Sequence, residues 1–153
     1  MRLGDSGKLE YVLAWAKETA IGKDVVITQA DIRAVQLAKA ALYVGAQYLM
    51  ERLGVDHVDE VILAGAFGSY IDKESAMAIG MFPDCDISRV HAVGNAAGDG
   101  ARIALLDAEK RREAAKVARS VEFIETAAES DFQKKFMDAI AIPHAKDKFP
   151  HAE

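Results

Sequence analysis

The chain has 153 residues, of which 51% are hydrophobic and 28% are charged, with a formal net charge of -5. These values are typical of one globular domain with a core of its own. No apolar run approaches the ~20 residues that a membrane-spanning helix needs, and no basic stripe would attract nucleic acid. We therefore expect no membrane and no nucleic acid among its partners.

Cysteine and histidine are too few and too scattered to suggest a metal centre. Cys85 is the only cysteine, so an internal disulfide is excluded, and the four histidines lack metal-ligand spacing. The first residues also lack the charged-then-apolar order of a signal peptide. We expect a cytoplasmic protein and predict no metal or iron-sulfur site in these residues.

The first third of the chain predicts two strands and a long helix. Residues 9–15 and 24–27 are β-branched or aromatic runs separated by Gly22, which is typical of strands that pair. Thr28 can cap a helix that ends at Gly54. Apolar residues between these caps recur every three or four positions and predict one broad buried face: Ile32, Val35, Ala38, Leu42, Ala46, Leu49 and Leu53.

Two short apolar runs, 60–64 and 90–93, have the pattern of strands buried on both faces of a parallel sheet. A helix is expected after each of them. The rest of the chain predicts a charged helix at 107–119, a strand at 121–124 and a short amphipathic helix from Ser130. We expect the domain to cover residues 1–143 and residues 144–153 to form a flexible tail.

This order of elements predicts an α/β domain with helices packed on a mixed sheet. Strand and helix spacing place Trp15 and Tyr48 in its core. Asp72 and Glu74 could form an acid pair, but their position at a predicted helix start favours capping. Cys85 lies between two aspartates, which disfavours its thiolate.

Glycine turns follow both apolar runs. Gly65 and Gly68 follow the first run, and Gly94-Asn95 follows the second. Ligands of open α/β sheets bind at the carboxyl ends of strands, so the two turns would flank one cleft if the strands are neighbours. Neither turn has the spacing of a Walker A loop or a Rossmann fingerprint. Taken alone, the turns favour a purely structural explanation, because tight strand-to-helix connections need glycine.

Four separated stretches, in the same order along the chain, strongly resemble the C-terminal domain of the reductive activators of corrinoid proteins. They are residues 27–33 (ITQADIR), 36–41 (QLAKAA), 63–71 (LAGAFGSYI) and 93–97 (VGNAA). The likeness covers about residues 8 to 143. The chain also resembles the second half of the wider acetate and sugar kinase, chaperone and actin superfamily.

The resemblance implies a ribonuclease H-like, actin-like ATPase subdomain that binds ATP with Mg in a cleft shared with another lobe. Its implied nucleotide-binding residues are Gly65, Ala66, Phe67, Gly68, Ser69, Gly94 and Asn95. No catalytic residue is implied within this chain. One departure is Ala66, because many superfamily members carry a Gly-Gly pair at this turn and a Cβ limits the approach of a ligand.

The resemblance further implies that the parent protein returns a corrinoid protein from Co(II) to Co(I) for methyl transfer. An iron-sulfur cluster would lie only in an upstream part, and the chain lacks the phosphate loop of the superfamily's first half. We therefore expect the isolated chain to be inactive. A homodimer is possible. Two alternatives stay open: a small-molecule kinase of the same superfamily, and a non-catalytic module for dimerisation or partner docking.

Overall fold

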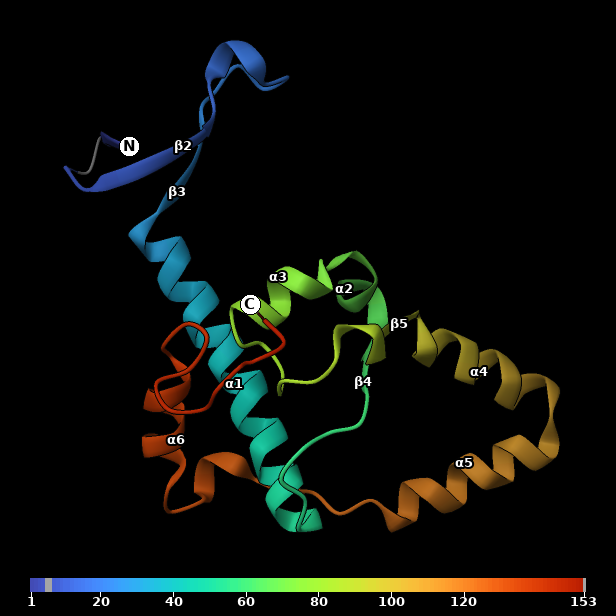
Figure 1. Cartoon of the computed structure of the whole chain (residues 1–153). Helices are drawn as coiled ribbons and strands as arrows, with labels where there is room; N and C mark the ends of the chain where they lie inside the picture. Colours follow the sequence, from blue (N-terminus) through green and yellow to red (C-terminus); the bar gives the residue numbers. More distant parts are fainter. Residues whose placement is uncertain (5–6, 153) are drawn as a thin grey trace.

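The computed structural model describes residues 1–4 and 7–152, with only the backbone described at Ala66 and Phe67. Figure 1 shows an N-terminal sheet at one end of a long helix, a second sheet beside that helix, and a helical arm that extends away from both. Helices and strands alternate, which confirms the α/β class. The antiparallel and parallel pairings lie in two separate sheets of the described chain.

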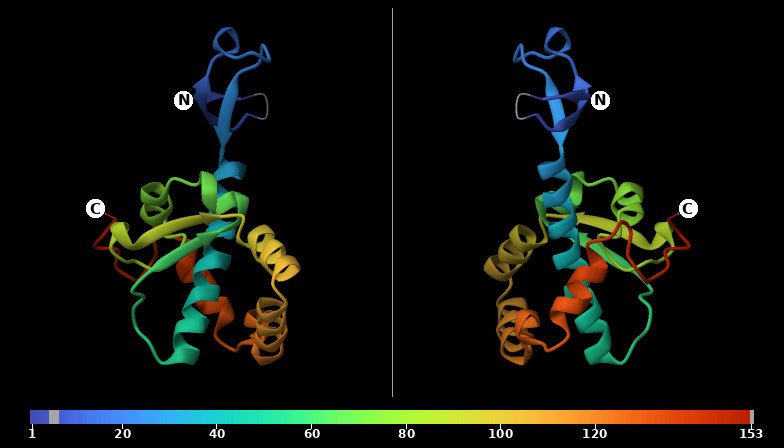
Figure 2. Two further views of the ribbon diagram at one scale, coloured as in Figure 1. Left: turned by 90° about the vertical axis from the view of Figure 1, so that its right-hand side faces the viewer. Right: turned by 90° about the vertical axis from the view of Figure 1, so that its left-hand side faces the viewer.

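The N-terminal sheet is antiparallel and has the strand order β1-β2-β3, with bounds Arg2–Leu3, Leu9–Ala14 and Val25–Thr28. The paired strands that the sequence predicted are β2 and β3, while β1 was not predicted. A 3-10 turn, η1 (Ala16–Glu18), lies in the β2–β3 connection. The sheet lies beyond the N-terminal end of the long helix, away from the second sheet (Figure 2).

The long helix α1 spans Gln29–Leu53, with both ends as predicted. Thr28 and Asp31 form a reciprocal capping box at its start, in which the Thr28 Oγ1 accepts from the Asp31 N-H. Gly54 ends the helix in the left-handed conformation, with φ of 69°. These caps depend on adjacent residues, so the sequence was sufficient to find them.

The second sheet contains two parallel strands, β4 (Val61–Ala64) and β5 (Val90–Gly94). Between them lie three short helical segments: α2 (Gly65–Tyr70), α3 (Lys73–Ala78) and η2 (Ile87–Arg89). Helices α4 (Ala96–Leu106) and α5 (Ala108–Ser120) form the arm, and η3 (Thr126–Ala128) and α6 (Phe132–Ala139) follow it. Every predicted helix is therefore confirmed. The turn after β4 is itself the start of a helix.

The core lies where α1, α3, α6 and β5 meet the C-terminal segment. It consists of Ala40, Tyr43, Val44, Tyr48, Ala76, Met77, Phe82, Cys85, Val90, Ala139 and Phe149. Lys39 is also fully buried, and its ammonium group donates hydrogen bonds to the carbonyls of Ala141 and Pro143. Burial lowers the pKa of Lys39 to about 8, because removal from water disfavours the charged form.

The buried face predicted for α1 was wrong for this chain. Leu42 and Leu49 are each 56% exposed, and of the seven predicted residues only Ala46 is even half-buried. The helix packs by its other side, through Tyr43, Val44 and Tyr48. The apolar stripe is real, but no described residue covers it.

Two further predictions were wrong. Residues 121–124 form no strand in the described chain, and Val121 and Phe123 are exposed because no neighbouring strand pairs with them. Trp15 is 48% exposed, and the Arg2 guanidinium lies 5.5 Å from the centre of its ring. Tyr48 is buried as predicted.

Residues 144–152, for which we expected a flexible tail, pack against α1 and the loop before β5. Phe149 is 7% exposed, and its ring lies 5.7 Å from that of Tyr43. The Tyr43 hydroxyl donates to Asp147 at 2.7 Å, and the His151 N-H donates to Asp84 at 3.1 Å. Burial of one aromatic ring thus fixes the segment. Within the described residues, no helix combines the length and apolar character needed to cross a membrane.

Candidate nucleotide-binding turns

The two glycine turns lie at the same end of one sheet. Strands β4 and β5 are parallel neighbours, with Leu63 opposite Ala92 and Ala64 opposite Gly94. Because parallel strands end on the same edge, the turns that follow them are adjacent, as the sequence analysis required. The carboxyl edge of this sheet therefore presents both candidate loops to one region of space.

Gly65 joins β4 directly to α2. Its φ is +94°, a region that residues with a Cβ rarely adopt. A Cβ built at Gly65 would meet no atom within 4 Å among the described residues beyond its immediate neighbours. The missing side chain therefore leaves open space in front of the backbone, which is the arrangement that a closely approaching ribose or phosphate requires.

Gly68 has a different role, because a Cβ there would lie 2.9 Å from the backbone carbon of Leu63. Its φ is not positive. The residue is glycine because α2 packs tightly on β4, and its missing side chain faces protein. Of the two glycines in the first turn, only Gly65 opens onto space that a ligand could fill.

The second turn lies close to Ser69 of the first. Gly94 has a φ of +66°, and a Cβ built there would lie 3.8 Å from the Ser69 hydroxyl oxygen. That hydroxyl donates a hydrogen bond to the carbonyl of Gly65 at 3.0 Å. The side chain of Ser69 therefore links the Gly65 turn to the Gly94 turn, although its own hydrogen is already used within the protein.

Asn95 caps α4, since its side-chain oxygen accepts from the Gly98 N-H at 3.0 Å. A Cβ at Gly98 would lie 2.9 Å from the Asn95 amide carbon, so Gly98 makes room for the cap. The asparagine thus orients the first turn of an 11-residue helix whose positive end faces the turns. Gly98 was missed as a supporting residue, although its spacing from Asn95 is visible in the sequence.

The side chains of Ala66 and Phe67 lie outside the described residues. Their backbone forms the first turn of α2, which begins at Gly65. Whether the Cβ of Ala66 limits a ligand's approach stays a prediction.

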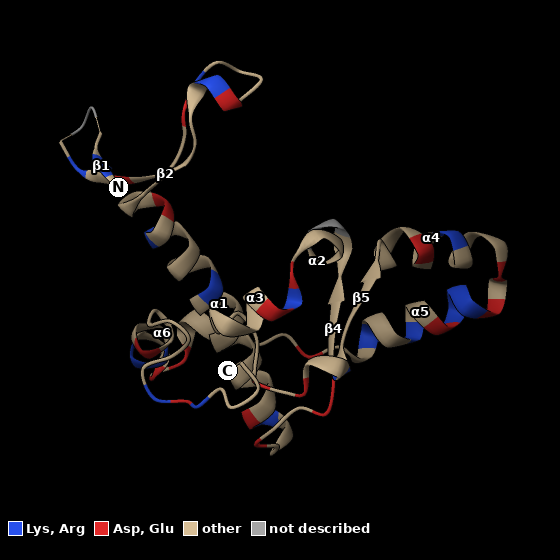
Figure 3. Ribbon diagram, turned by 45° about the horizontal axis from the view of Figure 1, so that its top comes forward, with Lys and Arg blue, Asp and Glu red and all other residues tan. Residues whose placement is uncertain are grey.

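The turns carry no positive charge of their own. In Figure 3 the ribbon of β4, α2 and β5 is mostly tan, with the arm and the N-terminal end of α1 carrying charges. Lys73, the cation next in sequence, donates to the carbonyls of Ile87 and Val90 at 3.0 and 3.4 Å. Arg102 on α4 pairs with Asp99 at 3.1 Å. Charge compensation for a bound phosphate would have to come mainly from elsewhere.

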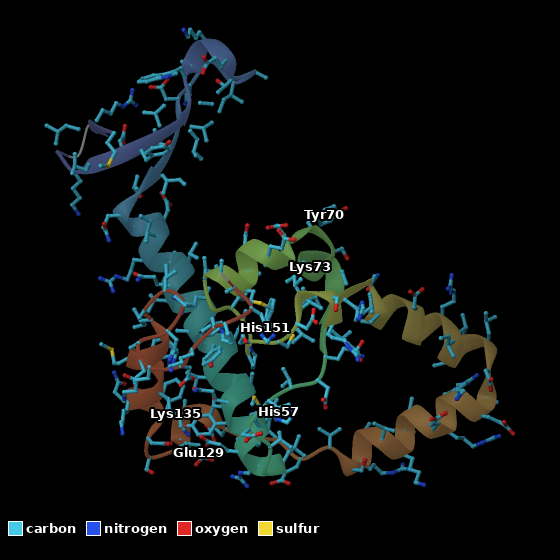
Figure 4. All side chains as sticks on the ribbon, viewed as in Figure 1. His57, Tyr70, Lys73, Glu129, Lys135 and His151 are labelled. Carbon is cyan, nitrogen blue, oxygen red and sulfur yellow. The ribbon has the colours of Figure 1, made fainter. Side chains whose placement is uncertain are left out.

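Among the side chains that the structure describes, Tyr70 is the exposed aromatic residue nearest the turns in sequence. It ends α2, is 90% exposed and points away from the body of the molecule, whereas Lys73 turns inward (Figure 4). It was not among the nucleotide-binding residues that the resemblance implied, although it lies within the 63–71 stretch that carries the resemblance. Its position makes it a further candidate for contact with a ligand at the turns.

Asp72 and Cys85, both considered from the sequence, have structural roles. Asp72 accepts from the Ser75 N-H at 2.8 Å and caps α3, and hydrogen bonding to Ser75 holds its pKa below the usual range. Cys85 is buried, and burial raises the pKa of its thiol, with Asp84 and Asp86 adding to the effect. Neither residue offers a reactive group to the turns.

Comparisons with known proteins agree with this geometry. The family model described as the C-terminal domain of RACo, the ASKHA domain, matches residues 1–153. The corrinoid activation enzyme RamQ of Eubacterium limosum is 40% identical over 129 residues, which are 83% of this chain and 22% of that protein. A solved reductive activator for corrinoid, iron-sulfur protein superposes with a TM-score of 0.84 at 39% identity, over 95% of this chain and 23% of its own.

The chain therefore spans less than a quarter of the length of these relatives. Its match to the family model is complete, and the likeness of sequence and fold extends through both glycine turns. The chain belongs to the family of C-terminal ASKHA domains of reductive activators of corrinoid proteins.

Proposed function

We propose that this chain is the nucleotide-binding half of an ATP-dependent reductive activator that returns corrinoid proteins from Co(II) to Co(I). One observation carries the proposal. Gly65 holds a positive φ beside open space, at the carboxyl edge of two neighbouring parallel strands. A backbone of this shape suits close contact with a nucleotide, and the names of the relatives support a role in the reductive activation of corrinoid proteins.

The proposal includes a division of labour between two lobes. The described turns provide backbone groups, the Ser69 and Asn95 side chains and a helix N-terminus, but no cation that is not already engaged. Mg and the positive groups that neutralise the phosphates would be held by the other lobe. We therefore expect the isolated chain to bind ATP weakly, because half of the contacts are absent.

A nucleotide can promote an unfavourable reduction only if it binds one conformation of the complex better than another. In the proposed cycle, closing of this domain on ATP favours the conformation that docks the corrinoid protein. The iron-sulfur cluster that supplies the electron would lie in another part of the same polypeptide. The role of the present chain is thus to couple nucleotide binding to docking.

A non-catalytic docking module is the second candidate, and it is favoured by the lack of positive charge at the turns together with the large exposed apolar area. The two candidates differ in a measurable way. A docking module would bind its partner equally well with and without ATP, whereas an ATP-dependent activator would not. The two relatives named above are both activators of corrinoid proteins by name, and neither is named as a small-molecule kinase.

The test is Gly65→Val in the protein at its natural length, followed through the corrinoid spectrum. Valine would place a branched side chain in the open space, so we expect ATP-dependent reduction to Co(I) to be lost while the iron-sulfur spectrum is unchanged. Gly22→Val is the matched control, because Gly22 also has a positive φ and open space but lies in the N-terminal hairpin. Retained reduction in Gly65→Val would refute the assignment of this turn.

A further inference from the structure

The last residues of the chain are held on α1 by a row of polar side chains. We call residues 140–152 the strap, which lies beside α1 in Figure 1. Four side chains of α1, at intervals of three or four, donate hydrogen bonds to it: Gln36, Lys39, Tyr43 and Gln47. This spacing places them on one side of the helix. Tyr43 and Gln47 both donate to the Asp147 carboxylate, at 2.7 and 2.9 Å.

The strap also holds the connection between α3 and β5. A Cβ built at Gly80 would overlap the carbonyl of Pro143, so the two backbones are in close contact. Further along, Asp84 accepts from the backbone N-H of His151 at 3.1 Å, and its carboxylate lies 2.6 Å from the ring Nδ1 of His151. Phe149 is buried in the core between these contacts and α1. The strap therefore joins α1 to the α3–β5 connection.

His144 organises the middle of the strap. Its side chain is 3% exposed, and its ring lies 5.0 Å from that of Tyr43. Its Nδ1 accepts from the backbone N-H of Lys146 at 3.2 Å and from that of Asp147 at 2.8 Å. Because an imidazole nitrogen that accepts a hydrogen bond carries no proton, these contacts assign the hydrogen of a neutral ring to Nε2. Two main-chain hydrogen bonds, and with them the position of Asp147, depend on a neutral His144.

A protonated His144 would not fit this site. A hydrogen on Nδ1 would point at two N-H donors, and Nε2 has no hydrogen-bond partner among the described residues. Burial is the main cause that lowers the pKa of His144 from 6.5, and Lys39 of α1 and Lys146 of the strap lower it further. Asp138 of α6 and Asp147 act in the opposite direction. The Asp147 carboxylate, however, already accepts from two side chains of α1.

We propose that residues 140–152 form an acid-released strap, which leaves α1 when His144 takes up a proton. In the released strap His144 is in water, so the released state binds more protons than the docked state below pH 6.5. The stabilisation that a neutral His144 gives is complete above pH 6.5 and is lost as the pH falls. Each pH unit between 6.5 and the lowered pKa shifts the docking equilibrium by up to about tenfold.

Release of the strap would separate the α3–β5 connection from α1 and uncover the buried rings of Tyr43 and Phe149. The inference does not depend on nucleotide binding. It differs from a purely structural role for His144, because a histidine kept only for its shape would hold the strap equally well at every pH in this range.

Amide hydrogen exchange of the natural-length protein between pH 5 and 7.5 tests the proposal. The readout is the protection of strap amides, which is the ratio of the intrinsic to the measured exchange rate at the same pH. In the wild type, protection should fall below pH 6.5 by up to roughly tenfold per pH unit. His144→Asn keeps an oxygen that can accept from the same N-H groups but does not titrate. Its protection should be lower than that of the wild type and independent of pH.

His151→Asn is the matched control, because His151 lies in the same strap but contacts Asp84 instead of α1. This variant should keep the pH dependence of the wild type. Protection that does not change with pH in the wild type would overturn the proposal. The same conclusion would follow if His144→Asn lost protection in acid as steeply as the wild type does.

Exchange of the imidazole Cε1 hydrogen, followed by mass spectrometry, needs no substitution and reports the titration of each histidine. Tryptic peptides 136–146 and 149–153 separate His144 from His151. We expect the midpoint of His144 to lie below pH 6.5 and to coincide with the loss of strap protection. A His144 that titrates at or above pH 6.5 while the strap stays protected would overturn the proposal, whether or not the strap of His144→Asn docks.

Discussion

Replacing Gly65 and Gly68 separately by alanine distinguishes ligand contact from internal packing. Gly65 has a φ of +94°, and a built Cβ meets nothing within 4 Å in the part of the chain that the structure describes, so we expect alanine to cost only the left-handed backbone, roughly 1–2 kcal/mol. At Gly68 the new methyl would lie 2.9 Å from the backbone of Leu63. Such overpacking typically lowers the free energy of unfolding by about 1–3 kcal/mol. Alanine is also a better helix former than glycine, which offsets up to ~1 kcal/mol of this loss.

The two substitutions should therefore lower the free energy of unfolding by similar amounts, on the order of 1–2 kcal/mol each. Their effects on ATP should differ. The methyl at Gly65 enters the proposed ligand space, and we expect roughly tenfold or greater loss of affinity, equivalent to about 1.4 kcal/mol or more. The methyl at Gly68 faces β4, so its affinity should stay within about threefold of the unmodified protein.

Urea unfolding measures the change in the free energy of unfolding, and titration calorimetry of the natural-length protein with ATP measures the change in affinity. Gly22→Ala is the control for backbone strain, since its φ is +62° and its built Cβ also meets nothing. The reasoning would be refuted if Gly65→Ala bound ATP as tightly as Gly22→Ala, or if Gly68→Ala weakened binding more than Gly65→Ala did.

Three other predictions concern stability. The pKa of buried Lys39 is lowered from 10.5 to about 8, so between these pH values the folded state binds fewer protons than the unfolded state. The free energy of unfolding of the wild type should therefore rise, relative to that of Lys39→Met, by on the order of 2 kcal/mol from pH 8 to pH 10. Urea unfolding of both proteins at the two pH values measures this gain. Gly80→Ala places a methyl group against the Pro143 carbonyl at a φ of +71°, and should lower the free energy of unfolding by about 2–4 kcal/mol. Gly54→Ala has a similar positive φ, but its built Cβ meets nothing within 4 Å among the described residues, and it should lower the free energy of unfolding by about 1–2 kcal/mol. Equal urea midpoints for the two variants would contradict the clash at Gly80. Phe149→Ala should cost about 3–5 kcal/mol in thermal or urea unfolding, and a loss below 1 would mean that the C-terminal segment does not pack as described.

The parts of the fold that depend on neighbouring residues were predictable from the sequence. Thr28 and Gly54 bound α1 through local hydrogen bonds and a left-handed cap, and both were found. The short apolar runs that became β4 and β5 were likewise recognised from their composition. The adjacency of the turns then followed from the general arrangement of parallel strands.

The parts that depend on what covers a surface could not be predicted. The spacing of Leu42 and Leu49 shows that a face of α1 is apolar, but not that this face is exposed in the described chain. The residues at 121–124 have a strand pattern without a strand to pair with. Lys39 is the opposite case, since a lysine in the core is rare and only its two carbonyl partners explain it.

The candidate site divides in the same way. The sequence shows glycine at positions 65, 68 and 94, but not why each position needs glycine. Gly65 has a positive φ beside open space, Gly68 packs closely on β4, and Gly94 has a positive φ close to Ser69. Only the three-dimensional arrangement separates a glycine that faces a ligand from one that faces protein. The proposed ligand, a nucleotide, comes from the resemblance to corrinoid activators, because the local residues left the ligand open.

The most direct test of nucleotide binding at these turns is photo-cross-linking of the natural-length protein with azido-ATP, followed by tryptic mapping. Cleavage after Arg52, Lys73, Arg89 and Arg102 isolates the two turns in peptides 53–73 and 90–102. We predict that label appears in at least one of these peptides and is displaced by excess ATP. Displaceable label found only outside them would contradict the account.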